Sequence, residues 1–218
     1  MFKGQAFHTL FLVLCFFSLT KLAVSFGNEA EFWGLSATAW YWIAILIPVI
    51  HQIFVWLVWR MELYYQYFTK NFGATGFKAY FIDFFILFIG RFVALCCLAI
   101  ADQGSIDIAD PLKWGLSLLI LVPGIYTMFS VRVYFSFKRA VGLDHFDPEI
   151  RKLPLVKKGM FKYTPNAMYT FALQMLWIFG LLAESQLALI VAAFESIYIW
   201  VHYFCTEKPD MEIMYGKD

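Results

Sequence analysis

The sequence predicts an all-α integral membrane protein: one domain (1–218) folded as a polytopic bundle of about six transmembrane helices, ending in a short helical hairpin. Composition is the first reason. Of the 218 residues, 61% are hydrophobic and only 15% are charged, whereas a soluble domain carries roughly 25% charged residues to cover its surface. The second reason is that the apolar residues form continuous runs. Residues 79–100, for example, would extend about 33 Å as a helix, enough to cross the hydrocarbon core of a bilayer.

The apolar runs place the helices at about 7–26, 35–59, 78–101, 112–135, 167–183 and 186–205. The first run follows Lys3 and ends in small residues at 23–25, a pattern that also fits a signal peptide. Because the rest of the chain is itself membrane-embedded, we expect a first transmembrane helix here. Residues 183–185 join the last two helices tightly. Pro209 is expected to end the last helix, so that Glu207 projects from its final turn.

Basic residues gather on one side of this predicted bundle. Thirteen of the 17 fall there: Lys3, Arg60, Lys70, Lys78, Lys138, Arg139, Arg151, Lys152, Lys157, Lys158, Lys162, Lys208 and Lys217. Only Lys21 and Lys113 fall on the other side, while Arg91 and Arg132 lie inside helices. Cytoplasmic loops carry the excess of Lys and Arg, so we expect a multi-pass protein with both termini and the long loop in the cytoplasm.

That loop, residues 136–166, is the only long hydrophilic connection. It contains three prolines and two glycines, which predict an irregular path rather than one helix. Its apolar side chains, among them Phe137, Phe146 and Phe161, favour an ordered segment. Loops of this length in compact proteins are usually functional or disordered, and we therefore expect a functional one.

Composition also excludes some classes of function. A net charge of +1 without a basic tail gives no reason to expect a nucleic-acid partner. The four cysteines form no CxxC pair and lie mostly in apolar runs, so we expect reduced thiols and no metal site. Nothing in the sequence indicates the oligomeric state.

Charged residues within predicted helices mark either function or a buried ion pair. Asp83 and Arg91 lie in the third helix, where a structural ion pair with another helix is one interpretation. Glu195 lies midway along the last helix and shares one face with Tyr198 and His202. This polar face either joins helices or lines a functional site.

Two stretches in the last third of the chain resemble a known pair of motifs. KKGMFKYTPNAMY (157–169) and HYFCTEKPDMEIMYG (202–216) flank the predicted hairpin. Together they resemble the integral-membrane methyltransferase superfamily, which includes phospholipid and isoprenylcysteine carboxyl methyltransferases. The matching positions are Gly159, Met160, Phe161, Lys162, Met168, Tyr169, His202, Glu207, Pro209, Tyr215 and Gly216.

The chain departs from the superfamily at two places. Residues 165–167 read Pro-Asn-Ala where relatives usually have Arg-His-Pro, and Glu207 is followed by Lys208 where many have a second glutamate. These departures suggest a retained cofactor pocket with an altered substrate side.

The resemblance implies an S-adenosylmethionine-dependent enzyme that methylates a lipid or another membrane-soluble amphiphile, with a phospholipid amine as the first choice. It implies a cofactor-binding region at about 136–218 and cofactor contacts from Gly159, Met160, Phe161, Tyr169, His202 and Glu207. An amine acceptor must lose a proton, and His145 and Glu195 are the candidate catalytic bases. Two alternatives stay open: an NADPH-dependent membrane reductase of the steroid-reductase type, and a non-enzymatic transporter or scaffold.

Overall fold

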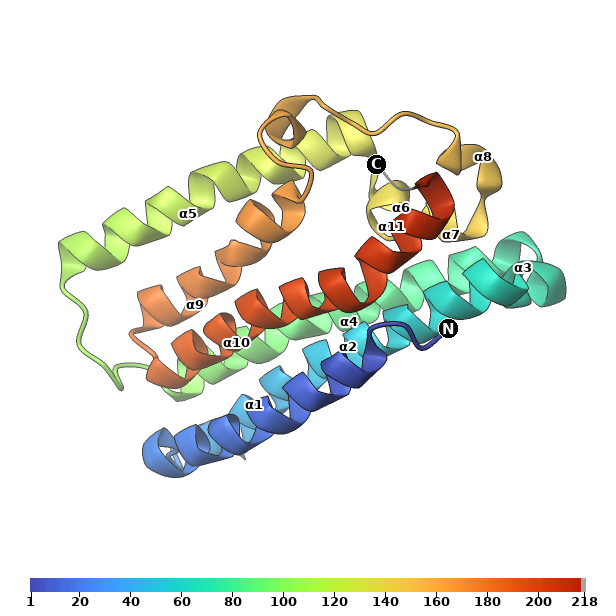
Figure 1. Cartoon of the computed structure of the whole chain (residues 1–218). Helices are drawn as coiled ribbons and strands as arrows, with labels where there is room; N and C mark the ends of the chain where they lie inside the picture. The colour runs from blue at the N-terminus through green and yellow to red at the C-terminus, as the bar shows by residue number, and fades with distance from the viewer. Residues whose placement is uncertain (217–218) are drawn as a thin grey trace.

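The computed structural model describes residues 1–216, and within them the protein is a bundle of long antiparallel helices (Figure 1). Five helices are long and apolar enough to cross a membrane, and a shorter apolar segment, Met168–Ala183, runs beside them. The predicted all-α polytopic bundle is therefore confirmed. The elements, in chain order, are α1 (Gln5–Phe26), β1 (Glu31–Phe32), β2 (Leu35–Ser36), α2 (Ala37–Tyr65), α3 (Tyr67–Phe72), α4 (Ala74–Ala101), α5 (Asp110–Ser130), η1 (Val131–Phe135), α6 (Phe137–Ala140), α7 (Leu143–Phe146), α8 (Pro148–Arg151), η2 (Gly159–Lys162), η3 (Met168–Ala172), η4 (Leu173–Met175), α9 (Leu176–Ala183), α10 (Gln186–His202), η5 (Tyr203–Glu207) and α11 (Lys208–Tyr215).

The helices of this bundle are apolar around most of their circumference. Side chains such as Tyr41, Leu95 and Leu176 are fully buried at the centre. The outer faces stay apolar as well: Phe17 of α1 is 65% exposed and Leu119 of α5 is 69% exposed. A helix satisfies all of its backbone hydrogen bonds internally, so such a face is stable in lipid but would be unfavourable in water.

Several predicted helix boundaries were wrong, among them the start of α4, which begins at Ala74 rather than 78. Residues 35–36 pair with residues 31–32 as a short antiparallel ribbon, so α2 begins at Ala37, and it continues to Tyr65 rather than 59. The last helix does not end at Pro209. The π-helical segment η5 carries it into α11, where Pro209 lies in the first turn. The proline leaves the Cys205 carbonyl, four residues earlier, without its intrahelical donor, and Gln5 and Arg60 donate to that carbonyl instead.

The long loop, the N-terminal residues and the C-terminal helix α11 lie at one end of the bundle. Figure 1 shows the N-terminus, α11 and the short helices α6–α8 together, while the α9–α10 turn lies at the opposite end. The long loop is ordered as short helices joined by turns, as its composition predicts. Lys217, counted above among the cytoplasmic basic residues, lies outside the described residues.

The N-terminal residues are anchored to the end of the last helix. Gln5 Nε2 donates to the Cys205 carbonyl and to Thr206 Oγ1, both at 3.2 Å. Arg60 of α2 donates to the Met1 carbonyl at 2.8 Å and forms an ion pair with Asp210, and both side chains of this ion pair are fully buried. Polar groups thus join α1, α2 and η5 at the end of the bundle that carries the loop.

Candidate functional site

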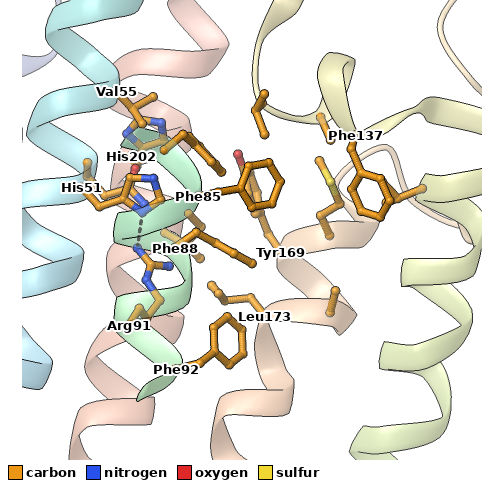
Figure 2. A pocket seen from close by; sticks show the side chains of 18 of the residues that line it. His51, Val55, Phe85, Phe88, Arg91, Phe92, Phe137, Tyr169, Leu173 and His202 are labelled. Carbon is orange, nitrogen blue, oxygen red and sulfur yellow. Dashed lines mark hydrogen bonds between the residues drawn. The ribbon is translucent and has the colours of Figure 1, made fainter. Parts of the chain in front are cut away.

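A cavity of about 190 Å³ lies between α2, α4, α5, α6, η3 and α10 (Figure 2). It is more than ten times the roughly 10–15 Å³ that a single water needs, so it is not a packing defect. Most of its lining is aromatic or aliphatic. Its polar lining residues are His51, Gln52, Arg91, Tyr169 and His202.

One wall of the cavity comes from α4. Phe84, Phe88 and Phe92 recur every four residues on one face of this helix, and Phe85 lies beside them. These rings are half-buried. The opposite wall includes Met128 and Val131 from the end of α5. An apolar slot at membrane depth suits an apolar ligand.

The two motif stretches meet at this cavity. Tyr169 on η3 donates its hydroxyl hydrogen to the carboxylate of Glu207 on η5. Tyr169 and His202 both line the cavity. His202 Nδ1 is buried and has no hydrogen-bond partner among the described residues, and the Trp59 ring lies 5.8 Å from the imidazole. Three of the six predicted cofactor residues are therefore together at one place.

The other three lie elsewhere. Gly159 has a φ of +58°, and a Cβ at this position would clash with Ser130 Oγ. The Met160 amide donates to the same Ser130 hydroxyl at 3.0 Å, and Phe161 stacks on Phe135 at a centroid distance of 5.0 Å. None of the three is among the cavity residues. Their contacts hold the loop against α5 and η1.

Glu195, one candidate base, forms an ion pair with Arg91, with Oε2 3.1 Å from Nε. Both side chains are buried, and the contact lacks the alignment of a hydrogen bond. Arg91 lines the cavity but Glu195 does not. Tyr198, on the same face of α10, accepts or donates a hydrogen bond with His8 at 2.8 Å. The polar face of α10 thus has separate partners on α4 and α1.

His145, the other candidate base, lies behind Trp59 in a buried cluster and does not line the cavity. Its ring stacks on the Trp59 indole at 4.2 Å, its Nδ1 is 3.2 Å from Asp144 and its Nε2 is 3.5 Å from Asp210. Tyr215 donates to the second Asp144 oxygen at 2.8 Å. This cluster joins the loop to α11.

The charges in this cluster stabilise one another. Burial acts to lower the pKa of His145, but hydrogen bonds and charges from Asp144 and Asp210 outweigh it, and the pKa is raised above its ordinary value of 6.5. Burial acts to raise the pKa of Asp144, but His145, Tyr215 and Arg139 together hold it below its ordinary value. An imidazolium between two carboxylates is therefore the favoured state.

Among the lining residues that sequence reasoning missed are His51 and Trp59, which have ring nitrogens at or near the cavity. Both come from α2, far from the recognised motifs, and neither carries a local signal in the sequence. Arg91 was singled out as an intramembrane charge, but its place beside a cavity depends on packing between helices. Among residues 1–216, no group of three or more His, Cys, Asp or Glu side chains is arranged to hold a metal ion.

Comparison with known proteins adds independent information. The model of the phospholipid methyltransferase family matches residues 112–218, from α5 onward. The comparisons with curated proteins and with solved structures gave no match. The matched region includes Tyr169, His202 and Glu207, whereas α1, α2 and α4 precede it. The resemblance noted in the sequence is thereby confirmed: residues 112–218 are similar to the phospholipid methyltransferase family, which is consistent with the integral-membrane methyltransferase superfamily and with the apolar helices of the fold.

Proposed function

We propose that the protein transfers a methyl group from S-adenosylmethionine to a lipid or another membrane-soluble amphiphile, with a phospholipid amine as the first choice. One observation carries the proposal. Two separate stretches with family motifs meet through Tyr169 and Glu207, next to a cavity that is polar on one side and apolar on the other. A cofactor from the cytoplasm and an acceptor from the bilayer would approach such a place from different sides.

The residues present fit the cofactor. S-adenosylmethionine supplies an electrophilic methyl group on a sulfonium, and it also carries an ammonium, a carboxylate, ribose hydroxyls and an adenine. Glu207 can accept from an ammonium or a hydroxyl. His202 Nδ1, which has no hydrogen-bond partner among residues 1–216, gives a ligand a polar contact. The aromatic faces of Tyr169 and Trp59 can stabilise a positive charge.

The apolar part of the cavity fits the acceptor. The α4 phenylalanines and Met128 exclude water, so an acyl or prenyl chain is the kind of group that this wall would favour. Transfer of a methyl group is a displacement that needs alignment of the two reactants, so the chain's main task is to position them. Neither His145 nor Glu195 lines the cavity, and both have charged partners. Positioning by Tyr169, His202 and Glu207 is therefore the part of the proposal with most support.

The test is cofactor binding by the detergent-purified protein, measured by calorimetry. We expect saturable binding of S-adenosylmethionine, and a loss of about tenfold or more in affinity for Glu207→Ala and for His202→Ala, because a lost polar contact costs about 1–3 kcal/mol. Glu149→Ala is the matched control, since it removes an exposed carboxylate in α8.

Two results would count against the proposal. Unchanged affinity in both site variants would place the cofactor elsewhere. Saturable binding of NADPH in place of S-adenosylmethionine would support a reductase. Transfer of a radiolabelled methyl group to lipid extracted from reconstituted vesicles then tests the reaction itself.

A further inference from the structure

His51 has an unusual position on α2. Its side chain is 2% exposed and lines the cavity, and its ring meets Phe84 edge-on at 4.5 Å. Its Nδ1 lies 3.4 Å from the Arg91 Nη2, as the dashed line in Figure 2 shows. Its other nitrogen, Nε2, is buried without a hydrogen-bond partner among residues 1–216.

Arg91 determines which ring nitrogen of His51 carries the proton. A guanidinium has only donors, so the nitrogen that faces it, Nδ1, must accept. In a neutral imidazole the other nitrogen is then the N–H donor. Nε2 is therefore a buried donor without an acceptor, and leaving such a group unsatisfied is costly. A ligand in the cavity would supply the missing acceptor.

The charges around His51 restrict what that ligand group can be. Arg91 is held by Glu195 at 3.1 Å and also lines the cavity. Because Glu195 offsets the charge of Arg91, the N–H of His51 decides the choice: an ammonium group has only donors and cannot bind it, whereas an oxygen can accept from it. The reacting amine of an acceptor is thus disfavoured at this point, while a hydroxyl, carbonyl or phosphate oxygen is favoured.

Depth separates this point from the cofactor residues. Glu195, which pairs with Arg91, precedes His202 by seven residues on α10, or about 10 Å along the helix. Figure 2 shows the same order, with His202 above His51 and Arg91 below it. The His51 donor therefore lies deeper among the spanning helices than the Tyr169–Glu207 contact.

We propose that His51 is a positioning residue that donates a hydrogen bond to an oxygen of the lipid acceptor, with Arg91 and Glu195 holding its ring in place. The inference rests on the proposed function for the identity of the reaction. Both His51 and Arg91 lie before residue 112, outside the region that the family model matches. Acceptor selectivity would thus come from the N-terminal helices and cofactor binding from the C-terminal part.

The test compares His51→Leu, which removes the donor, with His51→Gln, whose amide restores a donor near the position of Nε2. Binding of a fluorescently labelled phosphatidylethanolamine is measured without cofactor, and KM for the lipid and affinity for S-adenosylmethionine are measured separately. We expect His51→Leu to weaken lipid binding about tenfold and to raise KM for the lipid by a similar factor. His51→Gln should recover most of the lipid affinity. Neither variant should change the affinity for S-adenosylmethionine.

Ser117→Ala is the matched control, because Ser117 Oγ is also buried without a partner among the described residues but lies outside the cavity. It should behave like the parent. The proposal is overturned if His51→Leu binds the lipid with normal affinity. It is also overturned if His51→Leu loses affinity for S-adenosylmethionine instead, because His51 would then donate its hydrogen bond to an oxygen of the cofactor. If the parent transfers no methyl group but His51→Leu still loses lipid binding, the proposed function fails and the lipid contact stands.

Discussion

Replacing Glu195 by Gln tests whether this residue serves the fold or the chemistry. The structure gives Glu195 one charged partner, Arg91, at 3.1 Å, and the two side chains are 0% and 3% exposed. Two charges at that distance attract by about 5 kcal/mol at an effective dielectric constant of about 20. Removing one partner of a buried pair leaves the other charge uncompensated and typically costs about 3–5 kcal/mol. We therefore expect Glu195→Gln to lower the free energy of unfolding by about 3–5 kcal/mol.

The assay is reversible unfolding in mixed micelles by titration with a denaturing detergent, followed by tryptophan fluorescence. Glu184→Gln is the matched control. It removes a carboxylate that pairs with Lys113 at 2.9 Å at a partly exposed position, where such a pair contributes only about 0–1 kcal/mol. The double variant Arg91→Met with Glu195→Leu should recover most of the stability, because an apolar pair of similar volume replaces the buried ions. It should still bind the lipid acceptor weakly, since His51 loses its partner.

One result would refute this reasoning. If Glu195→Gln is as stable as the parent within about 0.5 kcal/mol while methyl transfer per folded molecule falls, then Glu195 acts in the reaction and Arg91 does not depend on it. Glu195 would then be a catalytic base rather than a structural partner of Arg91.

Two further predictions concern the loop and its orientation. Because the pKa of His145 is raised in the folded protein, its contribution to the free energy of unfolding is fully present below about pH 6.5 and is lost as pH rises through the folded-state pKa. The parent protein should therefore lose stability above about pH 6.5, whereas His145→Gln should show no such decline. Equal pH profiles of unfolding for the two proteins would contradict this prediction. The distribution of basic residues predicts which side of the membrane each loop faces. In a background without the natural cysteines, Lys157→Cys should react with an impermeant thiol reagent only from the cytoplasmic side, and Glu184→Cys only from the other side. Labelling of both cysteines from one side would refute the topology.

The helices were predictable because each one has its own signal in the sequence. An apolar run such as residues 79–100 must span a membrane or be buried whatever its neighbours are, and the structure has α4 there. The path after His202 was not predictable in the same way. Pro209 is a reliable helix breaker only if the helix keeps a regular α-helical hydrogen-bond pattern, and the π-helical turn η5 before it removes that condition.

The site was predictable only where its residues lie in a recognisable motif. Tyr169 and Glu207 come from the two motif stretches, and they do contact each other. Gly159 belongs to the same motif, but the surface on which its loop packs is set by Ser130, which no local pattern indicates. His51 is a lone histidine in an apolar helix. It becomes a candidate donor only because its Nδ1 contacts Arg91, 40 residues later in the chain.

The contact between Gln5 and Thr206 has a consequence for how the protein is made. These residues are 201 positions apart, so at about 5–20 residues per second Gln5 is synthesised roughly 10–40 s before its partner. During that time Gln5 and His8 of α1 have only each other as hydrogen-bond partners, because Tyr198, Cys205 and Thr206 are not yet made. The polar contacts that join α1 to the rest of the bundle can therefore form only after α10 and η5 have been made. A nascent chain that stalls before α10 would therefore expose polar groups within the bilayer, a signal by which membrane quality control can recognise it.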